Sequence, residues 1–164
     1  MKKEKRNLTF TSDPGHGWLS VTLKDLKELD IVDKISQYSY MTTTRAYLEE
    51  DCDAGVFLKA AKEKDWEISQ KDTYAEKTPI RNYPSYDSKK VDLAISLSVD
   101  SDVMLYNSSS KSFSTKAKVV KIEDNKIFLK CEFNNSYRVS KTKFLSSVAA
   151  PPKEDLNKSV KLSM

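Results

Sequence analysis

Residues 113–133, FSTKAKVVKIEDNKIFLKCEF, carry the strongest structural signal in the chain. Apolar and polar side chains alternate over residues 114–122 and again over 126–133, and a polar triplet at 123–125 separates the two runs. Such alternation is typical of strands with one buried face, so the stretch predicts an antiparallel hairpin. The second strand is expected to bury every other residue, namely Ile127, Leu129, Cys131 and Phe133. Phe128 is then the one apolar residue on the exposed face.

Shorter alternating runs flank this hairpin at residues 103–106 and 137–139. Strands this short can cover a core only if their sheet curls, which predicts a small all-β barrel over residues 102–150. Asparagines in the connecting loops are expected to adopt the left-handed backbone that glycine usually supplies. Residues 151–164 are predicted to form a flexible tail after the closing prolines.

The first half of the chain predicts a mixed domain. Strand-like alternation occurs at residues 7–12, 18–21, 37–41, 45–49 and 66–70. Thr22 and Asp25 form a capping-box start for one helix, and Asp53 is expected to cap a second helix over residues 54–64. Gly15 and Gly17 indicate a turn with special backbone requirements between the first two strands. The predicted order is two strands, helix, two strands, helix and strand.

The predicted fold class is therefore α+β, with two domains. A small α+β domain would occupy residues 1–86 and end in a tyrosine-rich segment, which is punctuated by Pro79 and Pro84. Residues 87–101 are expected to be a linker to the β-barrel.

The composition is that of a globular protein. The chain has 164 residues, of which 38% are hydrophobic and 32% are charged. No run approaches the roughly 20 apolar residues that span a bilayer, and no signal-peptide core is present, so we expect a cytoplasmic protein with no membrane partner. In that compartment Cys52 and Cys131 are expected to be free thiols. We expect no metal and no cofactor.

Positive charge is concentrated near the C-terminus. Residues 1–90 hold 16 basic and 16 acidic residues, whereas residues 111–146 hold nine basic and three acidic ones. Such an excess attracts polyanions, although a lysine-rich solubilising face explains the charge equally well. The candidate nucleic-acid-binding residues are Lys111, Lys116, Lys118, Lys121, Phe128, Lys130, Tyr137, Arg138, Lys141 and Lys143. Lysines would contact phosphates, and Phe128 or Tyr137 would stack or rest on sugars, unless Tyr137 belongs to the core.

Two features of the first domain are weaker candidates for chemistry. His16 could act as a general acid or base, but no partner for it is evident, and a hydrogen-bonded turn residue is the simpler interpretation. The acidic run at 49–53 could bind Mg²⁺ or mimic a phosphate backbone, but a solvated group of acids before a helix is favoured. Cys52 lies in this run, where carboxylates disfavour its thiolate, so we exclude cysteine catalysis. With no Walker loop, dinucleotide fingerprint, zinc pattern or triad order, we expect no enzyme.

Two parts of the chain resemble known classes of protein. The segments DVMLY, FSTKAKVVKIEDNKIFLKCEF, YRV and KTKFL, within residues 102–145, resemble the Tudor/KOW class of small barrels. That class binds methylated peptides or nucleic acid, and the basic character of this chain favours nucleic acid. The stretch DPGHGWLSVTLKDLKELDIVDKISQYSY is similar to small bacteriophage proteins of unassigned function, and the size and organisation of the chain resemble the MotB type of phage early protein.

These resemblances imply a largely sequence-independent binder of double-stranded DNA that modulates the host nucleoid or transcription. The first domain would form a homo-oligomer or bind a host nucleoid or transcription protein. The alternative is a protein-interaction inhibitor of a host polymerase, nuclease or defence factor.

Overall fold

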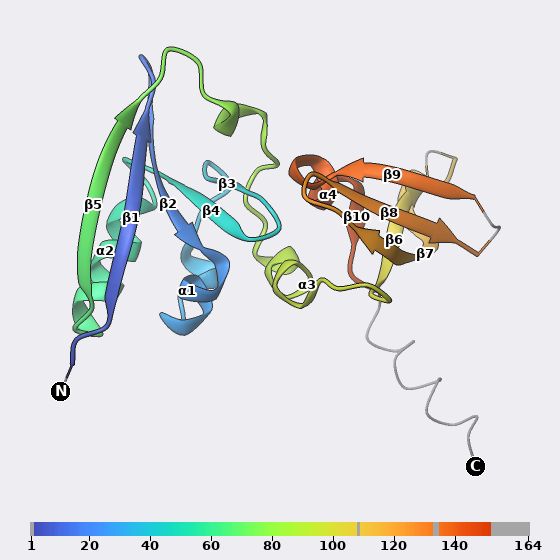
Figure 1. The fold of residues 1–164 in the computed structure, drawn as a ribbon, viewed down its shortest axis with the longest axis horizontal. Coiled ribbons are helices and arrows are strands. Elements are labelled where there is room, and N and C mark those ends of the chain that lie inside the picture. The colour runs from blue at the N-terminus through green and yellow to red at the C-terminus, as the bar shows by residue number, and fades with distance from the viewer. Residues whose placement is uncertain (1, 108, 133–134, 152–164) are drawn as a thin grey trace. The chain divides into compact units, whose positions relative to one another are not determined.

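The computed structural model describes residues 2–107, 109–132 and 135–151, and the chain divides into two compact units, Met1–Ile95 and Ser96–Met164 (Figure 1). The predicted core residue Phe133 and the predicted tail from residue 152 onward lie outside the described residues. No helix within the described part of the chain is long and apolar enough to cross a membrane.

The N-terminal unit is built on a five-stranded mixed sheet. Its strands are β1 (Lys5–Ser12), β2 (Gly17–Thr22), β3 (Tyr40–Met41), β4 (Arg45–Glu49) and β5 (Glu67–Tyr74). They lie in the order β3-β4-β2-β1-β5, in which β5 pairs parallel to β1 and the other neighbours are antiparallel. The predicted order of strands and helices is confirmed, and β3 is shorter than predicted. The mixed α+β class is also confirmed.

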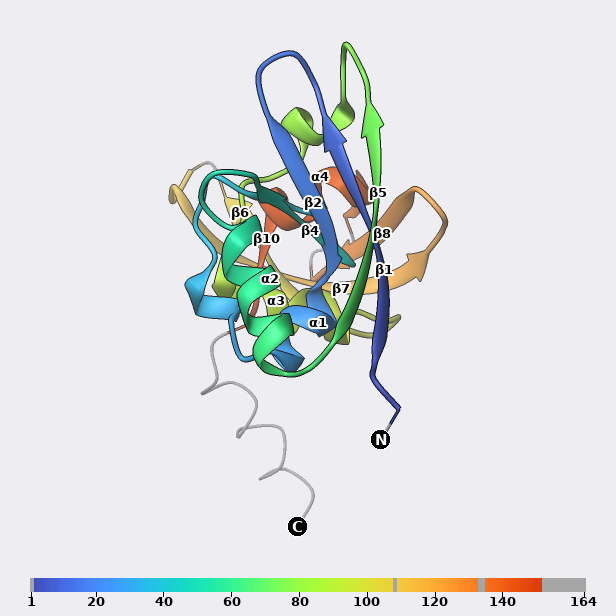
Figure 2. The same ribbon diagram turned by 90° about the vertical axis from the view of Figure 1, so that its left-hand side faces the viewer.

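Two helices, α1 (Leu23–Glu28) and α2 (Ala54–Glu63), lie on one side of this sheet (Figures 1 and 2). The predicted cap of α1 is confirmed, because the Thr22 hydroxyl accepts a hydrogen bond from the Asp25 backbone N–H. Asp53 stands at the N-cap of α2 but makes no capping bond there. Its carboxylate instead accepts hydrogen bonds from Ser36 and Ser39, which tie the preceding loop to the helix.

The helices and the sheet enclose the apolar core of this unit. Its largest fully buried side chains include Leu19, Leu23, Leu26, Leu48 and Phe57. At the edge of the core, the Arg6 guanidinium lies 4.3 Å from the centroid of the Trp66 ring and bonds the buried Asp25 carboxylate at 2.9 Å. The charge of the buried Asp25 carboxylate is therefore paired with Arg6, as a buried carboxylate requires.

The segment after β5 packs against the opposite face of the sheet. It contains the short 3₁₀ helices η2 (Pro79–Asn82) and η3 (Ser88–Lys90) and continues into α3 (Val91–Ser96). Arg81 lies over the Trp18 ring, 5.1 Å from its centroid, and Tyr83 lies 5.1 Å from Tyr47. Aromatic side chains of the sheet are thereby covered on this face.

The C-terminal unit is an antiparallel sheet with one helix. Its elements are β6 (Asp102–Asn107), β7 (Ser112–Ile122), β8 (Lys126–Cys131), β9 (Ser136–Ser140), α4 (Lys141–Ser147) and β10 (Val148–Ala149). The strand order is β10-β6-β7-β8-β9, and β9 and β10 are the edges of the described sheet, which does not close. The Tudor/KOW-like barrel therefore stays a prediction.

Helix α4 differs from the prediction, because the sequence pattern indicates only β-strands in this unit. The α4 residues Phe144 and Leu145 are buried, together with Val119, Ile127 and Leu129 of the sheet. The apolar side chains of α4 thus help to complete a core that a five-stranded open sheet does not enclose alone.

The backbone handedness of the loops differs from the expectation. Within the described residues, positive φ angles occur at Asp30, Asp65, Asp100 and Lys111, and at neither a glycine nor an asparagine. Gly17 is required for a different reason, because there is no room for a side chain at this position. A Cβ atom there would overlap the Phe10 ring and lie 2.8 Å from Glu50 Oε2.

The need for space at Gly17 can be tested with two glycine substitutions. Gly17→Ala is expected to lower the free energy of unfolding by about 1–3 kcal/mol, because the new methyl group overpacks against Phe10. Gly55→Ala has open space around the new Cβ, and is expected to raise the same quantity by about 0.5–1 kcal/mol through helix propensity. Both tryptophans of the chain lie in the N-terminal unit, so urea unfolding followed by tryptophan fluorescence reports on this unit. Equal effects of the two substitutions would contradict the close approach at Gly17.

Candidate functional site

Strand register brings much of the predicted nucleic-acid-binding set to one face of the C-terminal sheet. Lys118 lies opposite Lys130, Lys121 lies opposite Phe128, and Phe128 lies opposite Arg138. Directly opposed residues project from the same face of a sheet. The alternate residues are buried on the other face, against α4. We call the set on the outer face the basic face, and its members are Lys116, Lys118, Lys121, Lys126, the half-buried Phe128, Lys130 and Arg138.

A β-bulge in β7 shapes this face. Val119 pairs with Leu129 and Lys121 pairs with Phe128, so Val120 is the additional residue. The bulge returns Ile122 to the inner side and places Lys121 on the outer side. The Lys121 ammonium then lies 5.7 Å from the centroid of the Phe128 ring, which is a cation–π distance.

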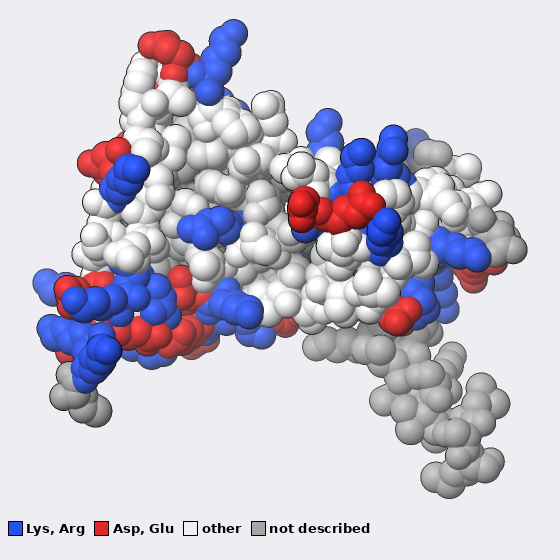
Figure 3. Space-filling model, viewed as in Figure 1, with Lys and Arg blue, Asp and Glu red and all other residues white. Residues whose placement is uncertain are grey.

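The charge of the basic face is only partly compensated. Among the strand residues of this face, six are basic and one, Asp102, is acidic. Asp102 pairs with Lys118 at 2.8 Å, and Glu123 at the end of the hairpin pairs with Lys121 at the same distance. Lys130 and Arg138 make no ion pair with the described residues. Figure 3 shows basic side chains around an acidic group on the visible side of this unit.

Four predicted residues lie away from the basic face. Lys111 is at the tip of the β6–β7 hairpin, and Lys141 and Lys143 are on α4. Tyr137 lies opposite Leu129, so it projects from the inner side of the sheet and not beside Phe128. It remains 47% exposed and lines an open pocket of about 610 Å³ with Tyr106 and Phe113, whose rings meet edge to face. The structure therefore places Phe128 and Tyr137 on different surfaces.

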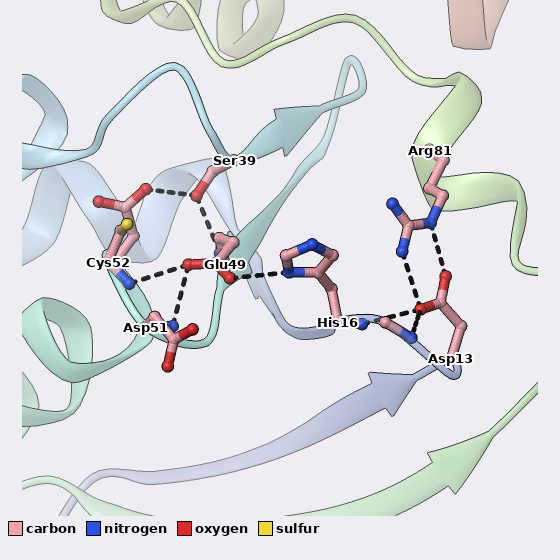
Figure 4. A network of polar contacts seen from close by, with 9 residues as sticks. Asp13, His16, Ser39, Glu49, Asp51, Cys52 and Arg81 are labelled. Carbon is pink, nitrogen blue, oxygen red and sulfur yellow. Dashed lines mark hydrogen bonds and ion pairs between the residues drawn. The ribbon is translucent and has the colours of Figure 1, made fainter.

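A second polar site occupies the N-terminal unit, where the loop after β1 meets the end of β4 (Figure 4). Asp13 holds this loop in shape. Its Oδ1 accepts hydrogen bonds from the backbone N–H groups of Gly15 and His16, both at 2.9 Å. Arg81 then donates two hydrogen bonds to the same carboxylate, at 2.6 and 2.9 Å. This bidentate pair lowers the pKa of Asp13, and the two backbone bonds act in the same direction.

His16 has a partner that the sequence did not reveal. Its Nδ1 lies 3.3 Å from Oε1 of Glu49, which is only 7% exposed. The other oxygen of Glu49 accepts hydrogen bonds from the backbone N–H groups of Asp51 and Cys52, both at 2.9 Å. Burial alone would raise the pKa of Glu49, but the bonds from Cys52, Asp51 and His16 outweigh it, and the pKa is lowered.

The acidic run at 49–53 is thus not a uniformly solvated patch. Glu49 and Asp53 are buried and bonded to the surrounding loop, while Glu50 and Asp51 are exposed. The bond to Glu49 raises the pKa of the Cys52 thiol, and the neighbouring carboxylates raise it further. This direction agrees with the exclusion of cysteine catalysis. A free thiol is confirmed at both Cys52 and Cys131.

A pocket of about 320 Å³ opens beside His16 and Glu49, and we call it the His16 pocket. Trp18, Tyr38 and Tyr40 supply aromatic walls, and Arg81 and Asp51 add charged groups. Trp18 is 1% exposed, and its indole N–H is the one buried side-chain polar atom among the described residues without a hydrogen-bond partner. Sequence reasoning missed this pocket because its members come from segments far apart in the chain.

The chain matches no protein-family model, no curated protein and no solved structure at a significant level. A fold does not by itself determine a function, which resides in the chemistry of the sites that the fold carries.

The Asp13–Arg81 contact predicts an acid-sensitive N-terminal unit. Because the pKa of Asp13 is lower in the folded state, its charge stabilises the fold above about pH 4, the ordinary aspartate pKa, and this stabilisation is lost as pH falls further. The Asp13→Asn variant is expected to melt at a lower temperature than the wild type at pH 7 and to lose less on acidification. Thermal melting followed by tryptophan fluorescence across this pH range measures both effects.

The matched control is Asp33→Asn, which removes a second aspartate of the same unit that makes no ion pair with the described residues. It is expected to keep the acid dependence of the wild type. An Asp13→Asn protein with an unchanged acid dependence would show that the Arg81 contact contributes no pH-dependent stability.

Proposed function

We propose that this protein is a non-enzymatic DNA-binding accessory protein whose C-terminal unit holds the phosphate backbone of double-stranded DNA. The observation that supports this proposal is the strand register, which gathers six basic side chains and Phe128 on one face. A lysine-rich stretch could have been divided between two faces, and β7 and β8 instead present their lysines together.

The composition of the face favours sequence-independent binding. Five of its six basic residues are lysines, which act as flexible point charges toward phosphate. Bases are read chiefly by planar amide and guanidinium groups, and Arg138 is the one such group among the strand residues of this face. Lys116 and Lys118 are spaced about 7 Å apart along β7, so they reach separate phosphates. Phe128 offers an apolar contact for a sugar.

The fold of this unit is compatible with the proposed Tudor/KOW-like barrel. The last strand, β10, returns to pair with the first, β6, so that five short strands form one continuous antiparallel sheet. This return is a step toward closure in a small barrel. Lys111, Lys141 and Lys143 lie off the basic face and would add to its long-range attraction for the polyanion.

The N-terminal unit would supply oligomerisation or a host partner. If several copies associate through this unit, each C-terminal unit adds a weak grip, and the assembly binds DNA by multivalency. Such an assembly could bridge or compact the host nucleoid in the cytoplasm and change transcription, as the resemblance to phage early proteins implies. The alternative is an inhibitor that docks on a host protein through the barrel or the acidic run, and the burial of Glu49 and Asp53 disfavours docking through the acidic run.

Salt dependence tests the proposed face directly. The Lys130→Gln/Arg138→Gln variant is expected to bind a random-sequence duplex more weakly at every salt concentration. Its plot of log affinity against log salt concentration should be shallower by about 2, because each lost phosphate contact removes roughly 0.9 from the slope. Fluorescence anisotropy with a labelled duplex measures both quantities on the full chain.

The control removes the same charge from the other unit. Lys59→Gln/Lys62→Gln changes two exposed lysines of α2 and is expected to leave the slope near that of the wild type. Equal losses in the two variants would show that net charge matters and the face does not. Absence of binding by the wild type at low salt would overturn DNA binding and favour a protein target.

A further inference from the structure

We propose that His16, Glu49 and Glu50 form a binding site for one divalent transition-metal ion of the Zn²⁺ class. A ligand atom from each of the three side chains lies within 4.8 Å of the other two. Three donors at this separation can close around a single ion with a small adjustment of their side chains. The inference is independent of the proposed DNA binding, because these residues lie in the N-terminal unit.

Two of the three ligands are positioned by contacts that do not involve the metal. The Asp13 carboxylate fixes the loop that carries His16, and Arg81 fixes Asp13. Glu49 is oriented by the backbone N–H groups of Asp51 and Cys52, which bind Oε2 and leave Oε1 directed toward His16. Outer contacts of this kind hold ligands in place before the metal arrives.

The third ligand depends on Gly17. The Glu50 backbone N–H donates to the Gly17 carbonyl at 3.0 Å, which joins the end of β4 to the start of β2. Oε2 of Glu50 lies only 2.8 Å from the position that a Cβ on residue 17 would occupy. The absence of a side chain at Gly17 thus lets Glu50 approach the other two ligands.

Charge and donor type favour a transition metal. Two carboxylates balance the two charges of the ion, and the imidazole favours Zn²⁺ and its neighbours over Mg²⁺ or Ca²⁺, which prefer oxygen donors alone. The ion would bind at His16 Nδ1, the ring nitrogen that faces Glu49, and would replace any proton there.

The His16 pocket gives the ion room for an exchangeable ligand. Three protein ligands leave at least one coordination position for water or for a small anion. His16 and Glu49 line this pocket, and so does Trp18, whose buried indole N–H has no partner among the described residues. A buried donor without an acceptor is uncommon, and the residue that carries it belongs to the lining of this pocket.

Zn²⁺ titration of the full chain tests the site. His16 is the only histidine, so its imidazole signals in an NMR spectrum need no assignment by mutation. We expect binding of one Zn²⁺ per chain by calorimetry, with a shift of the His16 signals that saturates at the same ratio. His16→Ala and Glu50→Gln should each weaken the affinity at least tenfold, and Mg²⁺ at the same concentration should not shift the His16 signals.

Asp51→Asn is the matched control for Glu50→Gln. Both remove one exposed carboxylate from the same turn, and only Glu50 belongs to the ligand set. Asp51→Asn should change the affinity less than threefold. Glu50 is exposed, so its variant tests the site even if His16→Ala perturbs the loop, and thermal melting verifies the fold of each variant. The proposal is overturned by absence of binding, by binding that leaves the His16 signals unchanged, or by equal losses in the two carboxylate variants.

Discussion

The buried carboxylate of Glu49 is the interaction on which the architecture of the N-terminal site depends. A charge that is 7% exposed persists only if its oxygens are bonded, and here the partners come from two directions. The backbone N–H groups of Asp51 and Cys52 bind one oxygen, which fixes the turn between β4 and α2. His16 approaches the other oxygen, which ties the β1–β2 loop to the same point. Two loops are therefore anchored by one ionised side chain.

The C-terminal unit depends on the register of its strands, which decides which side chains are buried. A shift of one residue between β7 and β8 would exchange the buried and exposed faces, and would bury Phe128 and Lys130 in place of Leu129. The bulge at Val120 shows how closely the faces are kept, because it restores the alternation that the long strand β7 would otherwise lose at Ile122. The basic face is thus a consequence of keeping the apolar residues inside.

Local patterns predicted much of this structure, and contacts between distant residues account for what they missed. Alternation placed the strands around Ile127 and Leu129, and the Thr22 hydroxyl caps α1 as its residue type and position indicate. The pairs His16–Glu49 and Asp13–Arg81 join residues 33 and 68 positions apart, and no spacing rule connects them.

The bonding of Asp53 and the face of Tyr137 also depend on contacts beyond the local pattern. Asp53 has the residue type and position of a cap, but its carboxylate accepts hydrogen bonds from Ser36 and Ser39 and makes no capping bond. The face taken by Tyr137 follows from its register against Leu129, and the sequence pattern left open whether Tyr137 belongs to the core.

The two proposed sites have opposite electrostatic requirements and lie in different units of the chain. The basic face attracts phosphate because its strands carry six basic residues and one acidic residue. The His16 pocket is lined by the carboxylates of Glu49 and Asp51, and the charge of Arg81 is paired to Asp13, so the pocket favours a cation and repels a polyanion. The residues proposed to bind a DNA backbone and those proposed to bind a metal ion therefore lie in different units and share no member. A substitution that abolishes binding in one unit therefore need not change binding in the other unit.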